Sequence, residues 1–199
     1  MEGVEAGGVK NPPYKEFLWW GVNANDWGAP YDVEQIVKDM NSVKGNPKGC
    51  KFILIGYSWG ATTATKVASD VVKQTNHKFD LIFTIDPITF RRVAKNGEKP
   101  PIKPVSDFTE NSKYDAGDYA TNGNWVNWYQ NLDIDSGPPP PKGTARGAQV
   151  RNAHNTPATE NMFNALGPNS WKTAHQEITR LPDVLNSLRG LSKSIAEQD

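Results

Sequence analysis

The chain has 199 residues, a length that suits one domain with a sizeable core. Its 22 basic and 22 acidic residues give a formal charge of zero, which argues against a nucleic-acid groove or a polybasic membrane patch. No apolar run approaches the roughly 20 residues that cross a bilayer, and the N-terminus lacks the basic start and apolar core of a signal peptide. We expect a single domain over residues 1–199, either complete or cut from a longer, exported or delivered protein, and we assign it no compartment.

The front of the chain predicts one strand and one helix. Residues 16–23 form a short apolar and aromatic run that ends at Gly and Asn, as a buried strand does. Asp32 then resembles a helix N-cap, with Gln35 three residues on as its capping-box partner. Apolar residues at helical spacing follow, and the helix should stop at Gly45.

The next segment predicts a parallel sheet. Residues 51–55 read as a strand buried on both faces, and small and apolar residues after Gly60 predict a helix that ends near Thr75. Residues 79–86 form a second apolar run, which is stopped by Pro87. This strand–helix–strand order favours right-handed parallel crossovers, and so an α/β fold with helices on both faces of the sheet.

The second half of the chain is harder to interpret. Residues 87–123 have no strong period, and their prolines favour loop or lid, whereas residues 124–131 and 148–153 predict two further strands. The four consecutive prolines at 138–141 favour a stiff extended crossing. Together with the prolines at 100–104, they form either a lid or substrate wall, or simply an exposed loop. Pro182 is well placed as the first residue of a last helix.

The stretch Gly-Tyr-Ser-Trp-Gly places Ser58 between Gly56 and Gly60, after an apolar strand and before a helix. This G-x-S-x-G context is typical of a nucleophile on a cramped strand-to-helix turn, where side chains at the flanking positions would collide. The backbone N–H of Trp59, directly after the nucleophile, is the first oxyanion donor to expect. The alternative is a glycine-rich turn in which Ser58 merely caps the helix.

A serine nucleophile needs a base and an acid, which usually follow it in the order acid, then histidine. Asp86 is the leading acid because it directly follows the next strand; the alternative is a turn-starting Asp before Pro87. His175 is the favoured base, in a loop just before the last helix, and His154 is the fallback, whereas His77 precedes the acid. Fallback acids in less informative loops are Asp107, Asp115, Asp118, Asp133 and Asp135.

The stretches FILIGYSWGATTA, LIFTIDP, WVNWYQN, GAQVRNAHN and HQEITRLPDV resemble bacterial α/β-hydrolases of the lipase and esterase type, some of which are toxin or secretion-system effector domains. The resemblance implies Ser58, Asp86 and His175 as a triad, with Ile178, Pro182 and Val184 as the matching frame around the base. It also matches Gly147, Val150, Ala153 and Asn155, which leaves His154 outside the matched positions. The elbow is its only sharp motif.

The resemblance implies a compact α/β-hydrolase fold and a serine esterase or lipase that cleaves lipid, phospholipid or small esters. An immunity protein would be the partner of a delivered toxin. The front looks short, because only one predicted strand precedes the elbow strand. Three outcomes follow if the fold lacks its first strands. Residues 21–25 provide the second oxyanion donor, a strand in a longer parent chain provides it, or the oxyanion site is incomplete. The alternative function is a catalytically silent hydrolase-like domain that binds a protein partner.

Other chemistries lack their motifs. The sequence has neither G-x-x-x-x-G-K-[ST] nor G-x-G-x-x-G, so no nucleotide cofactor is expected. With neither H-E-x-x-H nor a pair of cysteines, no zinc site is expected either.

Overall fold

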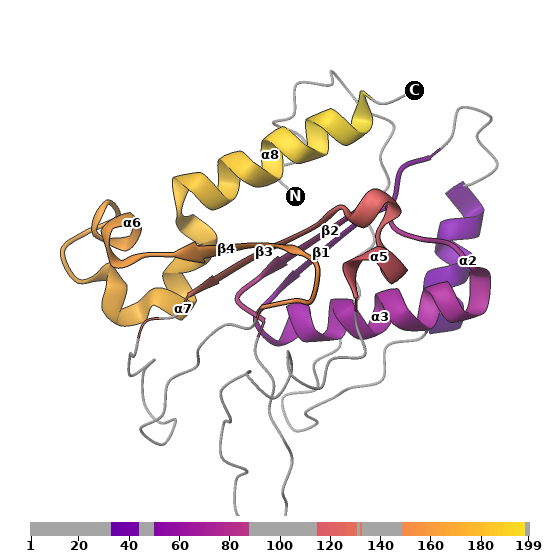
Figure 1. Ribbon diagram of the computed structural model, residues 1–199, viewed down its shortest axis with the longest axis horizontal. Coiled ribbons are helices and arrows are strands. Elements are labelled where there is room, and N and C mark those ends of the chain that lie inside the picture. The colour runs from indigo at the N-terminus through magenta and orange to yellow at the C-terminus, as the bar shows by residue number, and fades with distance from the viewer. Residues whose placement is uncertain (1–32, 44–49, 88–114, 131, 133–148, 198–199) are drawn as a thin grey trace, which may run out of the picture.

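A computed structural model describes residues 33–43, 50–87, 115–130, 132 and 149–197 (Figure 1). The predicted strand at 16–23, Asp32, and both proline-rich segments lie outside these residues. So do the fallback acids Asp107, Asp133 and Asp135.

Four parallel strands form the sheet, in the order β1-β2-β3-β4. They are β1 (Ile53–Tyr57), β2 (Leu81–Ile85), β3 (Trp125–Gln130) and β4 (His154–Ala158). All five residues of β2 are buried, as expected for an inner strand covered on both faces. The α/β class and the parallel sheet are therefore confirmed. The strands point toward α7 (Ala174–Glu177), so their carboxyl ends meet at that edge (Figure 1).

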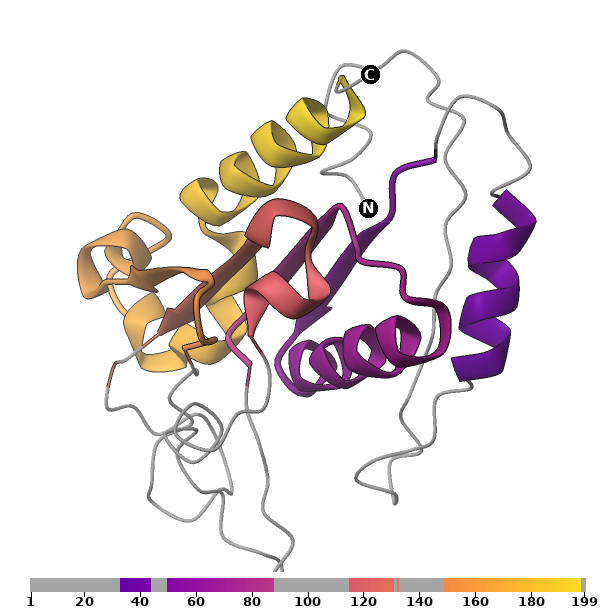
Figure 2. The same cartoon turned by 45° about the vertical axis from the view of Figure 1, so that its right-hand side comes forward.

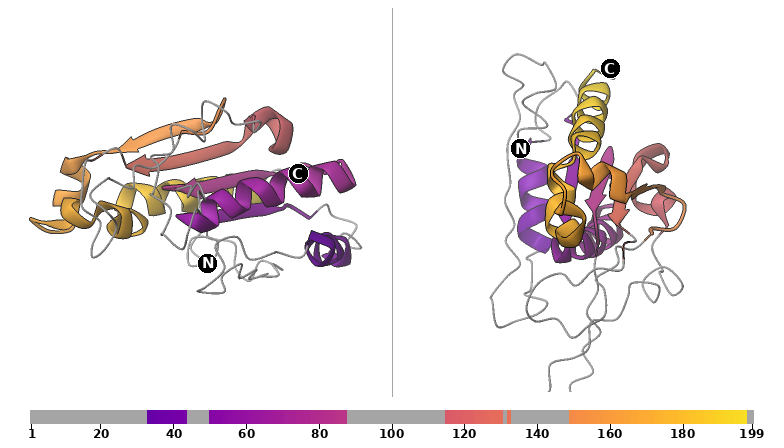
Figure 3. Two further views of the ribbon diagram at one scale, coloured as in Figure 1. Left: turned by 90° about the horizontal axis from the view of Figure 1, so that it is seen from below. Right: turned by 90° about the vertical axis from the view of Figure 1, so that its left-hand side faces the viewer.

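The first face of the sheet is covered by α3 (Trp59–Thr75), which runs along the strands (Figure 3). Its buried residues Val67, Ala68 and Val71 share a core with Ile82 and Trp125 from the sheet. The helix ends at Asn76, whose left-handed backbone lets its N–H reach the carbonyl of Val72.

The helix α2 (Val33–Val43) lies beside α3, at the end of the molecule opposite to α6 (Glu160–Asn164) (Figure 2). Its buried Ile36 and Met40 are four residues apart and join the α3 core, as the helical spacing predicted.

The second face is covered by α7 and by α8 (Pro182–Ala196), which lies on the side of the sheet away from α3 (Figure 1). The buried Ala174 of α7 and Val184 of α8, together with Ile178 between the two helices, pack against Phe83, Val126 and Trp128. Pro182 occupies the first position of α8 as predicted, where its missing N–H costs no helical hydrogen bond. None of the described helices is long and apolar enough to cross a bilayer.

Three predictions about secondary structure are wrong. The stretch 115–123 is not loop throughout, because it forms α5 (Ala116–Tyr119) and the 3-10 turn η1 (Thr121–Gly123). The strand expected at 148–153 lies at β4 instead, because Val126 pairs with His154 rather than with an earlier residue. His175 lies in α7, between the 3-10 turns η2 (Ser170–Thr173) and η3 (Ile178–Arg180), rather than in a loop.

The turn before β4 depends on Asn155. Its amide accepts a hydrogen bond from the backbone N–H of Val150 and donates to the carbonyls of Val150 and Ala153. On the other side it accepts a bond from the buried Asn127 of β3. This side chain therefore fixes where the chain turns and where the polar edge strand begins.

Candidate active site

Ser58 sits on a strained turn between β1 and α3. Its φ of 57° and ψ of −125° are rare for a residue with a side chain, and strain of this kind clusters at functional sites. Its backbone N–H donates to the carbonyl of Ile85 at 2.9 Å, which ties the turn to β2. No hydrogen bond from its side chain caps α3, so the capping alternative has no support in this geometry.

The two glycines of the motif differ. A Cβ at Gly56 would lie 2.6 Å from the carbonyl oxygen of Gly60 and 2.7 Å from the Cα of Ala61, so a side chain cannot fit. A Cβ at Gly60 would meet nothing within 4 Å. The prediction that both glycines avoid collisions is therefore right for Gly56 and wrong for Gly60.

The structure brings Ser58, Asp86 and His175 together at the carboxyl edge of the sheet. The Oγ of Ser58 lies 2.8 Å from the Nε2 of His175, and the Nδ1 of His175 lies 2.6 Å from the Oδ2 of Asp86. A carboxylate at Nδ1 holds the ring proton there, which leaves Nε2 of the neutral ring to accept the Ser58 hydroxyl proton. This relay is the geometry that a serine nucleophile requires.

Asp86 is completely buried, and burial raises the pKa of its carboxyl group above the ordinary value of 3.8. Hydrogen bonds and charge from His175, together with bonds from Gln130, oppose this rise in the pKa. The backbone N–H of Gln130 donates to Oδ1 at 3.0 Å, while the side-chain carbonyl of Gln130 accepts from the N–H of Leu132. The acid is thus held at both oxygens, and its orientation toward His175 is fixed.

Sequence reasoning missed Gln130 and Tyr57 as parts of this site. Gln130 ends the predicted strand 124–131, next to the strand that carries Asp86, so its position was the available signal. Tyr57 fills the position directly before the nucleophile, and its ring and hydroxyl both contact His175. No sequence pattern marks the contacts of Tyr57, because they join residues far apart in the chain.

His154 is not part of the triad. It opens β4, three strand positions or about 14 Å across the sheet from β1. His77 follows α3 and packs its ring edge against Phe52. Asp115 caps α5 and binds Asn152, so it has a structural role.

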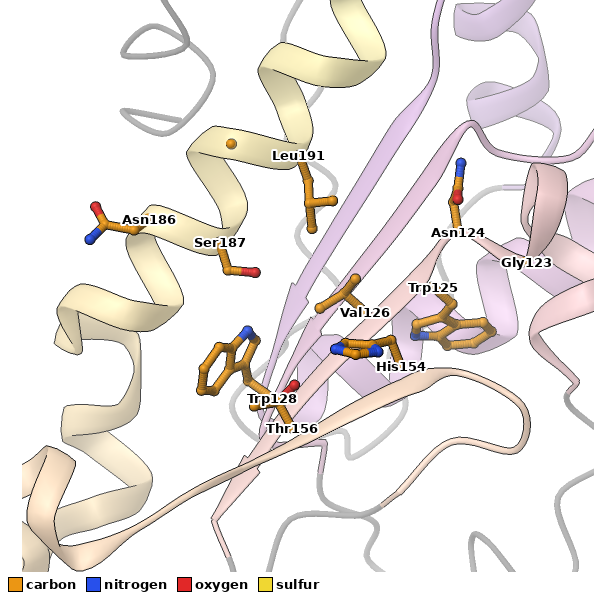
Figure 4. Close-up of a pocket in the computed structure, with 11 residues that line it drawn as sticks. Gly123, Asn124, Trp125, Val126, Trp128, His154, Thr156, Asn186, Ser187 and Leu191 are labelled. Carbon is orange, nitrogen blue, oxygen red and sulfur yellow. The ribbon is translucent and has the colours of Figure 1, made fainter.

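A groove of about 690 Å³ lies between α8 and strands β3 and β4 (Figure 4). Trp128 and His154 line its sheet side, and Ser187 and Leu191 line its helix side. None of the three residues of the triad lines it, so this groove is separate from the reacting atoms.

The described residues also bear on the oxyanion site. Trp59 is the first residue of α3, where backbone N–H groups have no helical partner and point toward the Ser58 turn. Residues 21–25, one predicted source of a second donor, lie outside the described part of the chain.

Within the described part of the chain, no three His, Cys, Asp or Glu side chains are grouped so that they could hold a metal ion.

Comparison with known proteins gives no match for this chain among protein-family models, curated proteins or solved structures.

Proposed function

We propose that this protein is a serine hydrolase of the α/β-hydrolase type that cleaves carboxylic esters through an acyl-enzyme. The observation that carries the proposal is the continuous relay from Asp86 through His175 to the Oγ of Ser58, which lies on a strained elbow. The order of serine, acid and histidine along the chain also agrees with that of α/β-hydrolases.

The mechanism follows from the positions of these atoms. As the Oγ of Ser58 attacks the ester carbonyl carbon, its proton passes to the Nε2 of His175. The buried Asp86 stabilises the imidazolium that forms, because the new positive charge compensates the carboxylate at short range in a buried site. The backbone N–H of Trp59 and the N-terminus of α3 stabilise the oxyanion.

Two proton transfers complete the cycle. The Nε2 of His175 gives its proton to the departing alcohol, which leaves the acyl group on Ser58. A water molecule then gives a proton to Nε2 and attacks the acyl carbon, and the proton returns to the Oγ of Ser58 as the acid product leaves. The enzyme ends in its starting state, ready for the next ester.

The test is labelling with a fluorophosphonate probe, combined with hydrolysis of p-nitrophenyl esters of increasing chain length. The native chain should be labelled at Ser58, and Ser58→Ala and His175→Ala should each lower kcat on the order of 10⁶-fold, because the triad acts as a unit. His154→Ala is the control and should keep full activity. No labelling of the folded native chain would refute the proposal and favour a silent domain that binds a partner.

The lipid or phospholipid preference rests on the resemblance of the sequence to lipases and esterases. The chain-length series addresses it directly. A rate that rises with acyl length favours a lipase, and a rate that peaks at acetate or butyrate favours a short-chain esterase.

A further inference from the structure

His175 lies on a segment that cannot hold itself in place. The helix α7 has only four residues, and 3-10 turns flank it on both sides. So short a helix is marginal by its own hydrogen bonds, and its position depends on tertiary contacts. The neighbours Ala174 and Ile178 are buried and anchor the backbone of this segment to the core. Neither contact fixes the rotation of the His175 ring.

Tyr57 makes two separate contacts with His175. Its hydroxyl donates a hydrogen bond to the backbone carbonyl of His175 at 2.5 Å. Its ring stacks on the imidazole, with the ring centroids 5.3 Å apart and the planes 25° from parallel. One contact therefore holds the backbone of the base and the other holds its ring.

The position of Tyr57 in the chain connects these contacts to the nucleophile. It is the last residue of β1 and directly precedes Ser58, so it moves with the nucleophile. A contact from Tyr57 to His175 sets the distance between Ser58 Oγ and His175 Nε2 from the side of the nucleophile. Asp86 fixes the orientation of the same imidazole ring through its other nitrogen, Nδ1.

We propose that Tyr57 is a positioning residue that holds His175 in register with Ser58 through its hydroxyl and its ring. The role of the base rests on the function proposed above, whereas the contacts themselves do not. The negative face of the ring also favours the imidazolium that forms when the proton of Ser58 is taken.

The hydroxyl of Tyr57 keeps its proton under ordinary conditions. Burial raises the pKa of Tyr57 to about 12, and the negative charges of Asp86 and Glu177 add to the rise. The group is therefore a hydrogen-bond donor throughout the neutral range, as the contact with the carbonyl of His175 requires.

Two variants separate the two contacts. Tyr57→Phe keeps the ring and loses the hydroxyl, and should lower kcat about threefold to tenfold, the range expected for one hydrogen bond. Tyr57→Leu loses both contacts and should lower kcat about tenfold to hundredfold. The KM and the midpoint of thermal unfolding of Tyr57→Phe should stay close to those of the native chain, because Tyr57 positions the base and does not bind substrate.

Tyr129→Phe is the matched control. Tyr129 is also half-buried near the end of a strand, and its hydroxyl accepts a hydrogen bond from Gln149 rather than contacting His175. Its loss removes an equivalent hydroxyl and should leave kcat unchanged. A kcat of Tyr57→Leu equal to that of the native chain would overturn the proposal.

A second measurement needs no catalytic activity. The Nδ1 proton that His175 shares with Asp86 should give a downfield proton resonance, assigned by its absence in His175→Ala. We expect Tyr57→Phe to keep this signal and Tyr57→Leu to broaden or lose it, because the ring is no longer held. If the native chain hydrolyses no ester and the signal still responds, the proposed function fails and the positioning role stands. If the native chain is active and the signal is unchanged in Tyr57→Leu, the positioning role fails and the proposed function stands.

Discussion

Two regions of this molecule differ in how their buried polar groups are paired. At the carboxyl edge of the sheet, the fully buried Asp86 bonds to His175 and Gln130, and Ser58 bonds to His175. At α8 and the strand β3 beneath it, which we call the α8 layer, three buried polar atoms have no hydrogen-bond partner among the described residues: the Nε1 of Trp128, the Nε of Arg189 and the Oγ of Ser192.

The difference indicates which buried polar groups have a specific role in the structure. Leaving a buried polar atom unpaired costs about 1–3 kcal/mol, so natural chains keep few of them. At the triad edge the polar groups are paired and the backbone is strained, with φ of 57° at Ser58 and 46° at Asp86. Backbone strain that is supported by hydrogen bonds is typical of a preorganised site. In the α8 layer, by contrast, the three polar atoms are buried without hydrogen bonds to described residues.

Among the variants that test this comparison, Asp86→Asn has the largest expected effect, because it removes the buried carboxylate at the centre of the triad edge. An amide can offer its N–H₂ to the Nδ1 of His175, which would leave the ring proton on Nε2, facing Ser58. The ring could then no longer accept the serine proton, and kcat should fall about 10⁴-fold. Steady-state hydrolysis of a p-nitrophenyl ester measures this, and an effect below tenfold would show that Asp86 does not orient the base.

The same variant should also change how stability depends on pH. Burial raises the pKa of Asp86 above 3.8, so folding favours the protonated carboxyl group. Its contribution to the free energy of unfolding is complete below about pH 3.8 and is lost as the pH rises through the folded pKa. The free energy of unfolding of Asp86→Asn relative to the native chain should therefore increase as the pH rises from about 3.8. Urea titrations over this range measure it, and a decrease would contradict the sign.

The two glycines sharpen the comparison within the catalytic edge. Gly56→Ala would place a Cβ against the backbone of Gly60 and Ala61, which cannot move away without displacing α3. We expect a loss of about 1–3 kcal/mol in the free energy of unfolding, with a parallel loss of fluorophosphonate labelling. Gly60→Ala is the matched control: it meets open space on a helix and should be neutral or stabilise by up to about 1 kcal/mol. Equal effects of the two variants would contradict this distinction.

The contrast between the regions also explains what the sequence could predict. The strands β1, β2 and β3 and the helices α3 and α8 were predicted because continuous apolar runs or helical spacing mark them. Ser58 and Asp86 converge because parallel strands bring their carboxyl ends to one edge, and His175 joins them from α7. The frame of Ile178 and Val184 is buried in the core beneath α7 and α8.

The elements that were missed lack a local signal. The strand β4 reads His-Asn-Thr-Pro-Ala and buries only Ala158 fully, so pairing with β3 defines it rather than an apolar pattern. The helix α7 has four residues, too few for a period to emerge. The roles of Tyr57 and Gln130 depend on contacts across 118 and 44 residues of sequence, respectively, which no motif records.

The variant with the smallest expected effect tests the α8 layer. Ser192 is only 3% exposed and its Oγ has no partner in the described part of the chain, so Ser192→Ala removes a buried polar atom and should stabilise the protein by about 1 kcal/mol. Thr84→Val is the contrasting control, because the hydroxyl of Thr84 accepts from the buried Nε1 of Trp125 and donates to Asn127. Its loss should destabilise by about 1–3 kcal/mol, since the buried Nε1 of Trp125 loses the acceptor of its hydrogen bond. Denaturant titration of both variants decides the matter: a destabilised Ser192→Ala would mean that the α8 layer uses its polar atoms after all, and the two regions would then no longer differ in kind.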